Sequence, residues 1–179
     1  MTENDILDVI ESWENFQFAL QQIEQNPEYI PVLMKVAIHS NNPNSWRALY
    51  LADKLHDILP EEIAPYLPEM IEQLKTEKHH GKKRHLLKLI SQNRVIPNTS
   101  GFLMDYCLNT FTSEKEPVAN RVHAMQILYN ISETEPELKP ELLEIILQEM
   151  EFHPTPGIVS RGKKLAKKLQ RQINARMPD

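Results

Sequence analysis

The chain has 179 residues, 41% hydrophobic and 25% charged, a balance typical of a folded protein rather than a disordered one. No apolar run approaches the roughly 18 residues that a membrane-spanning helix needs. The acidic N-terminus also lacks the basic start of a secretory signal, so we expect a cytoplasmic protein without membrane contact. The single Cys107 excludes an internal disulfide, and we expect it to be a small buried hydrophobe.

The chain contains four glycines and thirteen prolines, which favours helices over sheets. Hairpins between strands use glycine in their turns, whereas proline fits the first turn of a helix, where its missing N–H would have no partner. The pairs Asn26-Pro27 and Thr155-Pro156 have this form, with a side chain able to cap the helix before the proline.

In chain order, apolar residues recur at steps of three and four, the period of an amphipathic helix. The first stripe runs from Ile6 to Ile23 and predicts one helix over residues 3–25. Eight further helices follow in pairs. Short polar loops join the members of each pair, so we expect antiparallel helical hairpins. The hairpins are predicted at 28–58, 63–93, 98–133 and 138–176.

An arginine recurs at the start of the second helix of each predicted pair. Arg47, Arg84, Arg121 and Arg161 are separated by 37, 37 and 40 residues. A fixed period over two-helix units is typical of stacked hairpins in a solenoid rather than of a simple bundle.

Two stretches carry a resemblance to a known family: PYLPEMIEQLKTEKHHGKKRHLLKLI from Pro65 and LKPELLEIILQEMEFHPTPGIVSRGKKLAKKL from Leu138. Each stretch has a leucine-rich helix that begins at proline, then a short turn, then a helix with an arginine near its start. HEAT repeats have the same order of features, and in this respect the chain resembles that family. The resemblance implies an all-α, right-handed α-α superhelix of the ARM/HEAT type. This short solenoid would stack about four hairpins behind an N-terminal capping helix at 3–25, in one domain over 1–179.

The arginines lack the aspartate that HEAT repeats usually place about six residues earlier. Asn41, Lys78, Lys115 and Thr155 occupy those positions. The sequence therefore leaves open whether the arginines are structural or bind a ligand.

Signatures of catalysis and of cofactor binding are missing from the sequence. The glycines form no phosphate-binding loop, and neither a GxSxG nor an HExxH pattern occurs. His79, His80 and His85 lack the spacing of four that would place two metal ligands on one helix face. We therefore expect no metal, no cofactor and no enzymatic activity.

Charge divides sharply along the chain. Residues 1–72 hold thirteen acidic and three basic residues. Residues 73–179 hold twelve acidic and seventeen basic residues. The predicted last helix contains no acidic residue. Its basic residues are Arg161, Lys163, Lys164, Lys167, Lys168, Arg171 and Arg176.

These observations favour a non-enzymatic protein-interaction scaffold. In HEAT-like stacks the second helix of each hairpin lines the concave side, so the resemblance implies a basic binding groove. Its predicted residues are Arg47, Arg84, Arg121, Arg161, Lys83, Lys164 and Lys168. The alternative is a nucleic-acid-binding or DNA-repair protein that uses such a groove in an alkylation-repair-like helical repeat fold. A third reading is self-association of the acidic N-terminal end with the basic C-terminal end.

Overall fold

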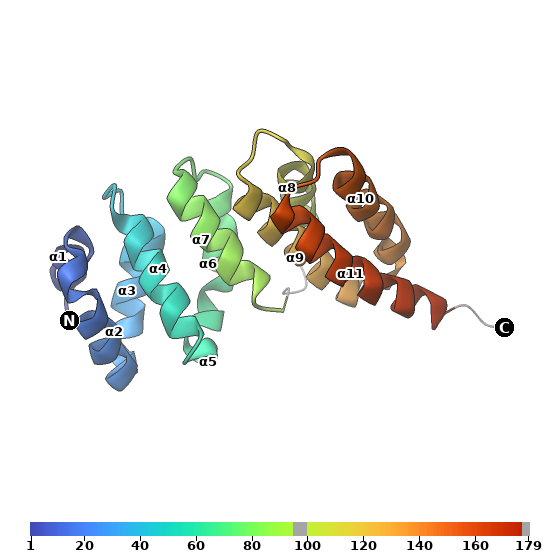
Figure 1. Ribbon diagram of the computed structural model, residues 1–179. Helices are drawn as coiled ribbons and strands as arrows, with labels where there is room; N and C mark the ends of the chain where they lie inside the picture. The colour runs from blue at the N-terminus through green and yellow to red at the C-terminus, as the bar shows by residue number, and fades with distance from the viewer. Residues whose placement is uncertain (95–99, 177–179) are drawn as a thin grey trace. The chain divides into compact units, whose positions relative to one another are not determined.

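The computed structural model describes residues 1–94 and 100–176, and these residues form eleven α-helices, four short 3-10 helices and no strand (Figure 1). The all-α, HEAT-like fold class is confirmed. The right-handed twist of the whole superhelix stays a prediction. Among the described residues, no helix is both long and apolar enough to cross a membrane.

The chain divides into two compact units, residues 1–93 and 94–179. The single domain expected over 1–179 stays a prediction. The helices of the first unit are α1 (Glu3–Glu11), α2 (Phe16–Gln25), α3 (Ile30–His39), α4 (Ser45–His56), α5 (Pro60–Ile63), α6 (Leu67–Leu74) and α7 (His80–Ser91). Those of the second are α8 (Ser100–Thr112), α9 (Val118–Thr134), α10 (Lys139–Phe152) and α11 (Pro156–Asn174).

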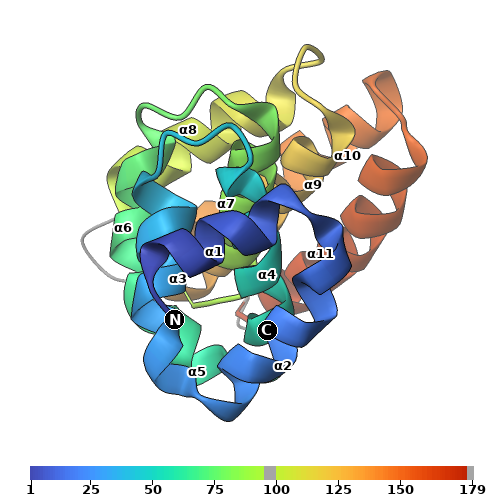
Figure 2. The ribbon, with the colours of Figure 1, turned by 90° about the vertical axis from the view of Figure 1, so that its left-hand side faces the viewer.

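The N-terminal segment differs from the single helix predicted over 3–25. Helix α1 ends at Glu11, Ser12 is extended, and a 3-10 turn at Trp13–Asn15 leads into α2. The Ser12 hydroxyl accepts a hydrogen bond from the Glu14 backbone N–H at 3.3 Å, a local bond that competes with continued helix. Ile6 and Ile23 are buried as predicted, but from two helices whose directions differ (Figure 2).

Three helices begin in the same way. Short 3-10 turns at Pro27–Tyr29, Ala64–Tyr66 and Pro136–Leu138 lead into α3, α6 and α10, and each of these helices carries proline in its first turn. Proline is tolerated there because the first-turn N–H groups have no intrahelical acceptor. The predicted start at Thr155-Pro156 is confirmed, since the Thr155 hydroxyl caps α11 by accepting from the Ile158 N–H.

In each unit, buried apolar residues from several helices form the core. The first unit buries Leu33, Leu49 and Leu86 completely, from three different helices. The second buries Phe111 and Cys107 on α8. Burial raises the pKa of the Cys107 thiol far above its ordinary value, which fits the predicted role of a small hydrophobe.

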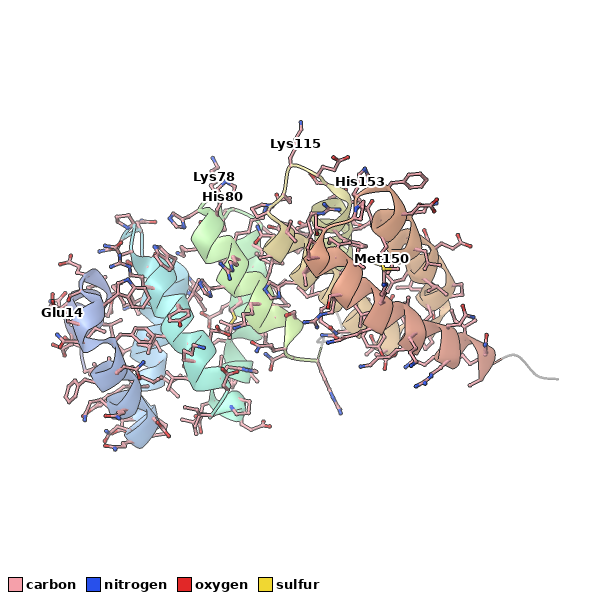
Figure 3. The ribbon with its side chains drawn as sticks, in the orientation of Figure 1. Glu14, Lys78, His80, Lys115, Met150 and His153 are labelled. Carbon is pink, nitrogen blue, oxygen red and sulfur yellow. The ribbon has the colours of Figure 1, made fainter. Side chains whose placement is uncertain are left out.

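Helices α10 and α11 lie side by side in the second unit. Gly162 of α11 is buried, and a Cβ atom at this position would stand 2.6 Å from the Met150 sulfur and 2.9 Å from the Met150 Cγ. The Met150 side chain of α10 therefore occupies the space that a side chain at position 162 would need. Met150 lies beside α11 in Figure 3.

Candidate interaction surfaces

The seven residues of the predicted groove belong to both units. Arg47, Lys83 and Arg84 lie in the first unit, on α4 and α7, and the other four lie in the second, on α9 and α11. Within the second unit, Arg161, Lys164 and Lys168 line one surface hollow together. Arg121 does not take part in it.

Arg121 is a correction to the predicted groove, because the residue is buried and only 3% exposed. One guanidinium nitrogen lies 2.7 Å from a Glu149 carboxylate oxygen, and Nε donates to the backbone carbonyl of Phe111 at 2.8 Å. The arginine thus joins α9 to the end of α8 and to α10. Its role is structural, and the paired acid is a glutamate of the following helix rather than the family's usual aspartate.

Arg47 also makes structural contacts. It donates to the carbonyl oxygens of Ile10 and Glu11, at 2.8 and 3.0 Å. These carbonyls are at the C-terminal end of α1, where a positive charge is favourable. The guanidinium carbon also lies 5.2 Å from the Trp13 ring centroid and 5.5 Å from that of Trp46. Arg84 is exposed, and Lys83 is half-exposed.

Buried lysines are neutralised in the same manner. Lys82 donates to the carbonyls of Ile38 and Ser40 and lies 3.5 Å from Glu77. Lys139, 5% exposed, pairs with Glu133 and donates to Gln172 at 2.8 Å. These cations hold helices together, as buried charges must be paired to be tolerated.

The basic residues on one face of α11 differ from these buried cations, because they are exposed to solvent or half-exposed. A hollow of about 300 Å³ opens on this face, lined by Gln126 and Leu165 together with Arg161, Lys164, Lys167, Lys168 and Arg171. We call these five basic residues the α11 basic face. Apart from Arg161, which is half-exposed, all are exposed, and none has a carboxylate partner among the described residues.

Two members of this face are held in place by α9. Arg161 donates to the Gln126 side-chain oxygen at 2.6 Å, and the Lys168 nitrogen lies 5.5 Å from the Tyr129 ring centroid. Neither contact neutralises the positive charge, because the amide is neutral and a ring attracts a cation only weakly. Both contacts reduce the side-chain entropy that binding would cost.

Like charges on α11 repel one another. Lys164 and Lys168 are four residues apart on the helix, as are Lys167 and Arg171. Each such pair destabilises a helix by about 0.2–0.5 kcal/mol. A bound anion would remove this repulsion, so the α11 basic face is suited to a ligand that carries several negative charges.

An aromatic cluster in the first unit was missed by sequence reasoning. The rings of Trp13, Phe16, Trp46, Tyr50 and His85, which we call the aromatic strip, form a continuous chain of contacts with centroids 5.0 to 6.2 Å apart. Trp13 remains 44% exposed. The spacing of Trp46 and Tyr50, four apart on α4, was the available signal, but nothing linked it to Trp13.

His85 is the buried end of the aromatic strip. It is 7% exposed and stacks on Trp46, and its Nδ1 has no hydrogen-bond partner. Burial lowers the pKa of His85 from 6.5 to about 4; the nearby Asp53 opposes this shift, and Arg84 and Lys88 add to it. The imidazole is therefore neutral at neutral pH.

This burial predicts an acid-sensitive contribution to stability. The unfolded chain takes up a proton on His85 near pH 6.5, whereas the folded chain resists protonation until about pH 4, so the free energy of unfolding falls as the pH drops through this window. The loss reaches at most about 3 kcal/mol. His85→Phe keeps a ring against Trp46 and should abolish this part of the loss. Urea unfolding of both proteins at several pH values tests it, and equal pH dependence would contradict the prediction.

Among the described residues, no three His, Cys, Asp or Glu side chains are grouped so that they could hold a metal ion. The titratable groups with the largest pKa shifts are His85 and Cys107, and burial is the main cause of both shifts.

The comparisons with known proteins agree with the helical hairpins. A family model for the HEAT repeat domain matches residues 5–169. No curated protein and no solved structure matches the sequence significantly. The match covers most of both units, and the repeated proline-marked helices and interhelical arginines accord with it: the chain belongs to the HEAT repeat family.

Proposed function

We propose that this protein is a non-enzymatic scaffold that binds an acidic segment of another protein on the α11 basic face. The observation that carries the proposal is the contrast among the cations of the second unit. Arg121 and Lys139 are buried and paired with glutamates, whereas the five residues around the hollow have no carboxylate partner among the described residues.

The shape of the surface supports an extended ligand. The five basic residues span almost three turns of α11, from Arg161 to Arg171, which is about 15 Å along a helix. An extended chain covers that distance with about five residues. A segment with several glutamates or aspartates could therefore contact the whole face, with Arg161 offering the planar donor geometry that suits carboxylates.

A nucleic acid carries the same sign of charge, and the experiment must separate the two partners. Fluorescence anisotropy of a labelled decaglutamate peptide and of a labelled decathymidine, each titrated at low and physiological salt, does so. We expect the peptide to bind. Tighter binding of the oligonucleotide with a steeper loss in salt would replace the acidic protein segment by nucleic acid as the partner.

The matched variants are K164E/K168E and K78E/K115E, which change the net charge equally. Lys78 and Lys115 are exposed, lie outside the hollow, and project from turns in Figure 3. We expect the α11 variant to weaken peptide binding at least about tenfold, since it removes two favourable charges and adds two repulsive ones. The control variant should change affinity by less than about twofold, as expected for distant, screened charges. Equal losses in the two variants would show that net charge alone, and not this face, binds the peptide.

A further inference from the structure

The α11 basic face carries more positive charge than the carboxylates of an extended segment can balance. Its five basic residues follow one side of α11 from Arg161 to Arg171 and surround a single hollow. Side chains of an extended segment alternate between two faces, so of about five residues over this length only about three turn toward the helix. Their carboxylates supply about three negative charges. About two positive charges of the face would then remain without a counter-charge.

Phosphorylated side chains remove this mismatch. A phosphoserine or phosphothreonine carries about −1.5 to −2 charges at pH 7, so three of them carry about −4.5 to −6. The five positive charges of the face lie inside that range. Charge balance therefore favours a segment with phosphate groups at alternate positions over one with carboxylates at the same positions.

The hydrogen-bonding capacity of the face favours the same ligand. Lysine and arginine side chains hold several N–H donors each and no acceptor. Of these donors the described chain uses one, in the bond from Arg161 to the Gln126 side-chain oxygen. A phosphate has one more acceptor oxygen than a carboxylate. A phosphate that accepts from both Lys164 and Lys168 would also offset the repulsion between these two neighbours.

The lining of the hollow distinguishes a phosphorylated protein segment from a nucleic acid. Single-stranded nucleic acids stack their bases on aromatic side chains in addition to making phosphate contacts. Among the described residues that line the hollow, none is aromatic. Tyr129, which lies near Lys168, is buried. Bases would therefore find no exposed ring beside the cations, whereas a phosphorylated peptide needs none.

We propose that the α11 basic face binds a phosphorylated segment of a partner protein, with phosphoserine or phosphothreonine at alternate positions of an extended chain. The inference rests on the proposed function, because it uses the same face and specifies the acidic groups of the partner. Binding therefore depends on the phosphorylation state of the partner.

Four labelled peptides of equal length test the proposal by fluorescence anisotropy at physiological salt. Three of them hold phosphoserine, glutamate or serine at the same three alternate positions, with glycine elsewhere. The fourth holds its three phosphoserines side by side and has the same net charge as the first. We expect the alternate phosphoserine peptide to bind at least about tenfold more tightly than the glutamate peptide, and the serine peptide not to bind. The fourth should bind at least about threefold more weakly than the first, because its middle phosphate turns away from the face.

The variants K164E/K168E and K78E/K115E locate the contact. We expect the first to weaken binding of the alternate phosphoserine peptide at least about tenfold. The second, which changes the net charge equally at exposed residues outside the hollow, should change it by less than about twofold. Circular dichroism of each variant verifies folding. Equal losses in the two folded variants would overturn the assignment to this face.

The outcomes separate this inference from the proposed function. Equal affinities for the alternate phosphoserine and glutamate peptides, both lost in K164E/K168E, would overturn the inference and leave the proposed function standing. No saturable binding of either peptide at millimolar concentration would contradict both. Equal affinities for the alternate and adjacent phosphoserine peptides would mean that net charge alone decides, and would overturn the extended arrangement. Tighter binding of decathymidine than of the alternate phosphoserine peptide would assign the face to nucleic acid instead.

Discussion

Replacing Arg121 by methionine is expected to lower the free energy of unfolding by about 3–5 kcal/mol, the range for removing one partner of a buried ion pair. The substitution leaves the buried Glu149 carboxylate with His153 as its remaining close partner, at 3.1 Å. It also leaves the Phe111 carbonyl without its arginine donor. Urea unfolding followed by circular dichroism measures the loss.

A double variant distinguishes an isolated charge from lost packing. R121M/E149L replaces both ions by apolar side chains, and such replacements of buried pairs are often nearly neutral. We expect the double variant to be more stable than Arg121→Met alone by at least about 2 kcal/mol, the cost of the unpaired charge. If Arg121→Met cost less than about 1 kcal/mol, the value typical of an exposed pair, the structural role assigned to Arg121 would be wrong.

Replacing Gly162 by valine is expected to cost about 2–3 kcal/mol, because overpacking a close helix contact strains both helices. The added Cβ would meet the Met150 sulfur at 2.6 Å and Ile146 Cγ2 at 3.4 Å. Relief by moving the Met150 side chain is only partial, since valine adds two further methyl groups.

Gly101→Val is the matched control, since Gly101 lies in α8 with nothing within 4 Å of its Cβ position. It should leave stability unchanged or raise it slightly, as valine has a higher helix propensity than glycine. Met150→Ala should reduce the cost of Gly162→Val by about 1 kcal/mol or more by making room. If Gly162→Val and Gly101→Val behaved alike, the close approach of α10 and α11 at this point would be refuted.

Much of the fold was predictable because it depends on local patterns. The period of three and four located the helices, and the combination of proline with a capping residue located the start of α11. The break at Ser12 was not predictable, since the apolar stripe from Ile6 to Ile23 continues across it. One side-chain hydrogen bond and the packing of Trp13 decide that break, and neither has a periodic signal.

The candidate surfaces were predictable in part. Lys164 and Lys168 could be assigned to one face because they lie four apart on one helix, and they do line one hollow with Arg161. The recurring arginine correctly predicted where the second helix of each hairpin begins. It did not predict whether each arginine side chain is buried or exposed. Arg121 is buried because Glu149 and the Phe111 carbonyl meet it from other helices, and such tertiary contacts are not visible in spacing.

The predicted self-association of the acidic and basic ends stays a prediction. It competes with the binding of an acidic segment, because both would use the α11 basic face. Light scattering at low and physiological salt tests it. A monomer at both salt concentrations would remove self-association and leave the face available to another protein.

The most direct test of the central proposal is nuclear magnetic resonance mapping of the decaglutamate contact on the isotopically labelled 179-residue chain. Binding on the α11 basic face predicts that the largest amide shifts fall between Arg161 and Arg171 and at Gln126, and that they disappear in K164E/K168E. Shifts centred on other residues, with those of α11 unchanged, would contradict the proposal.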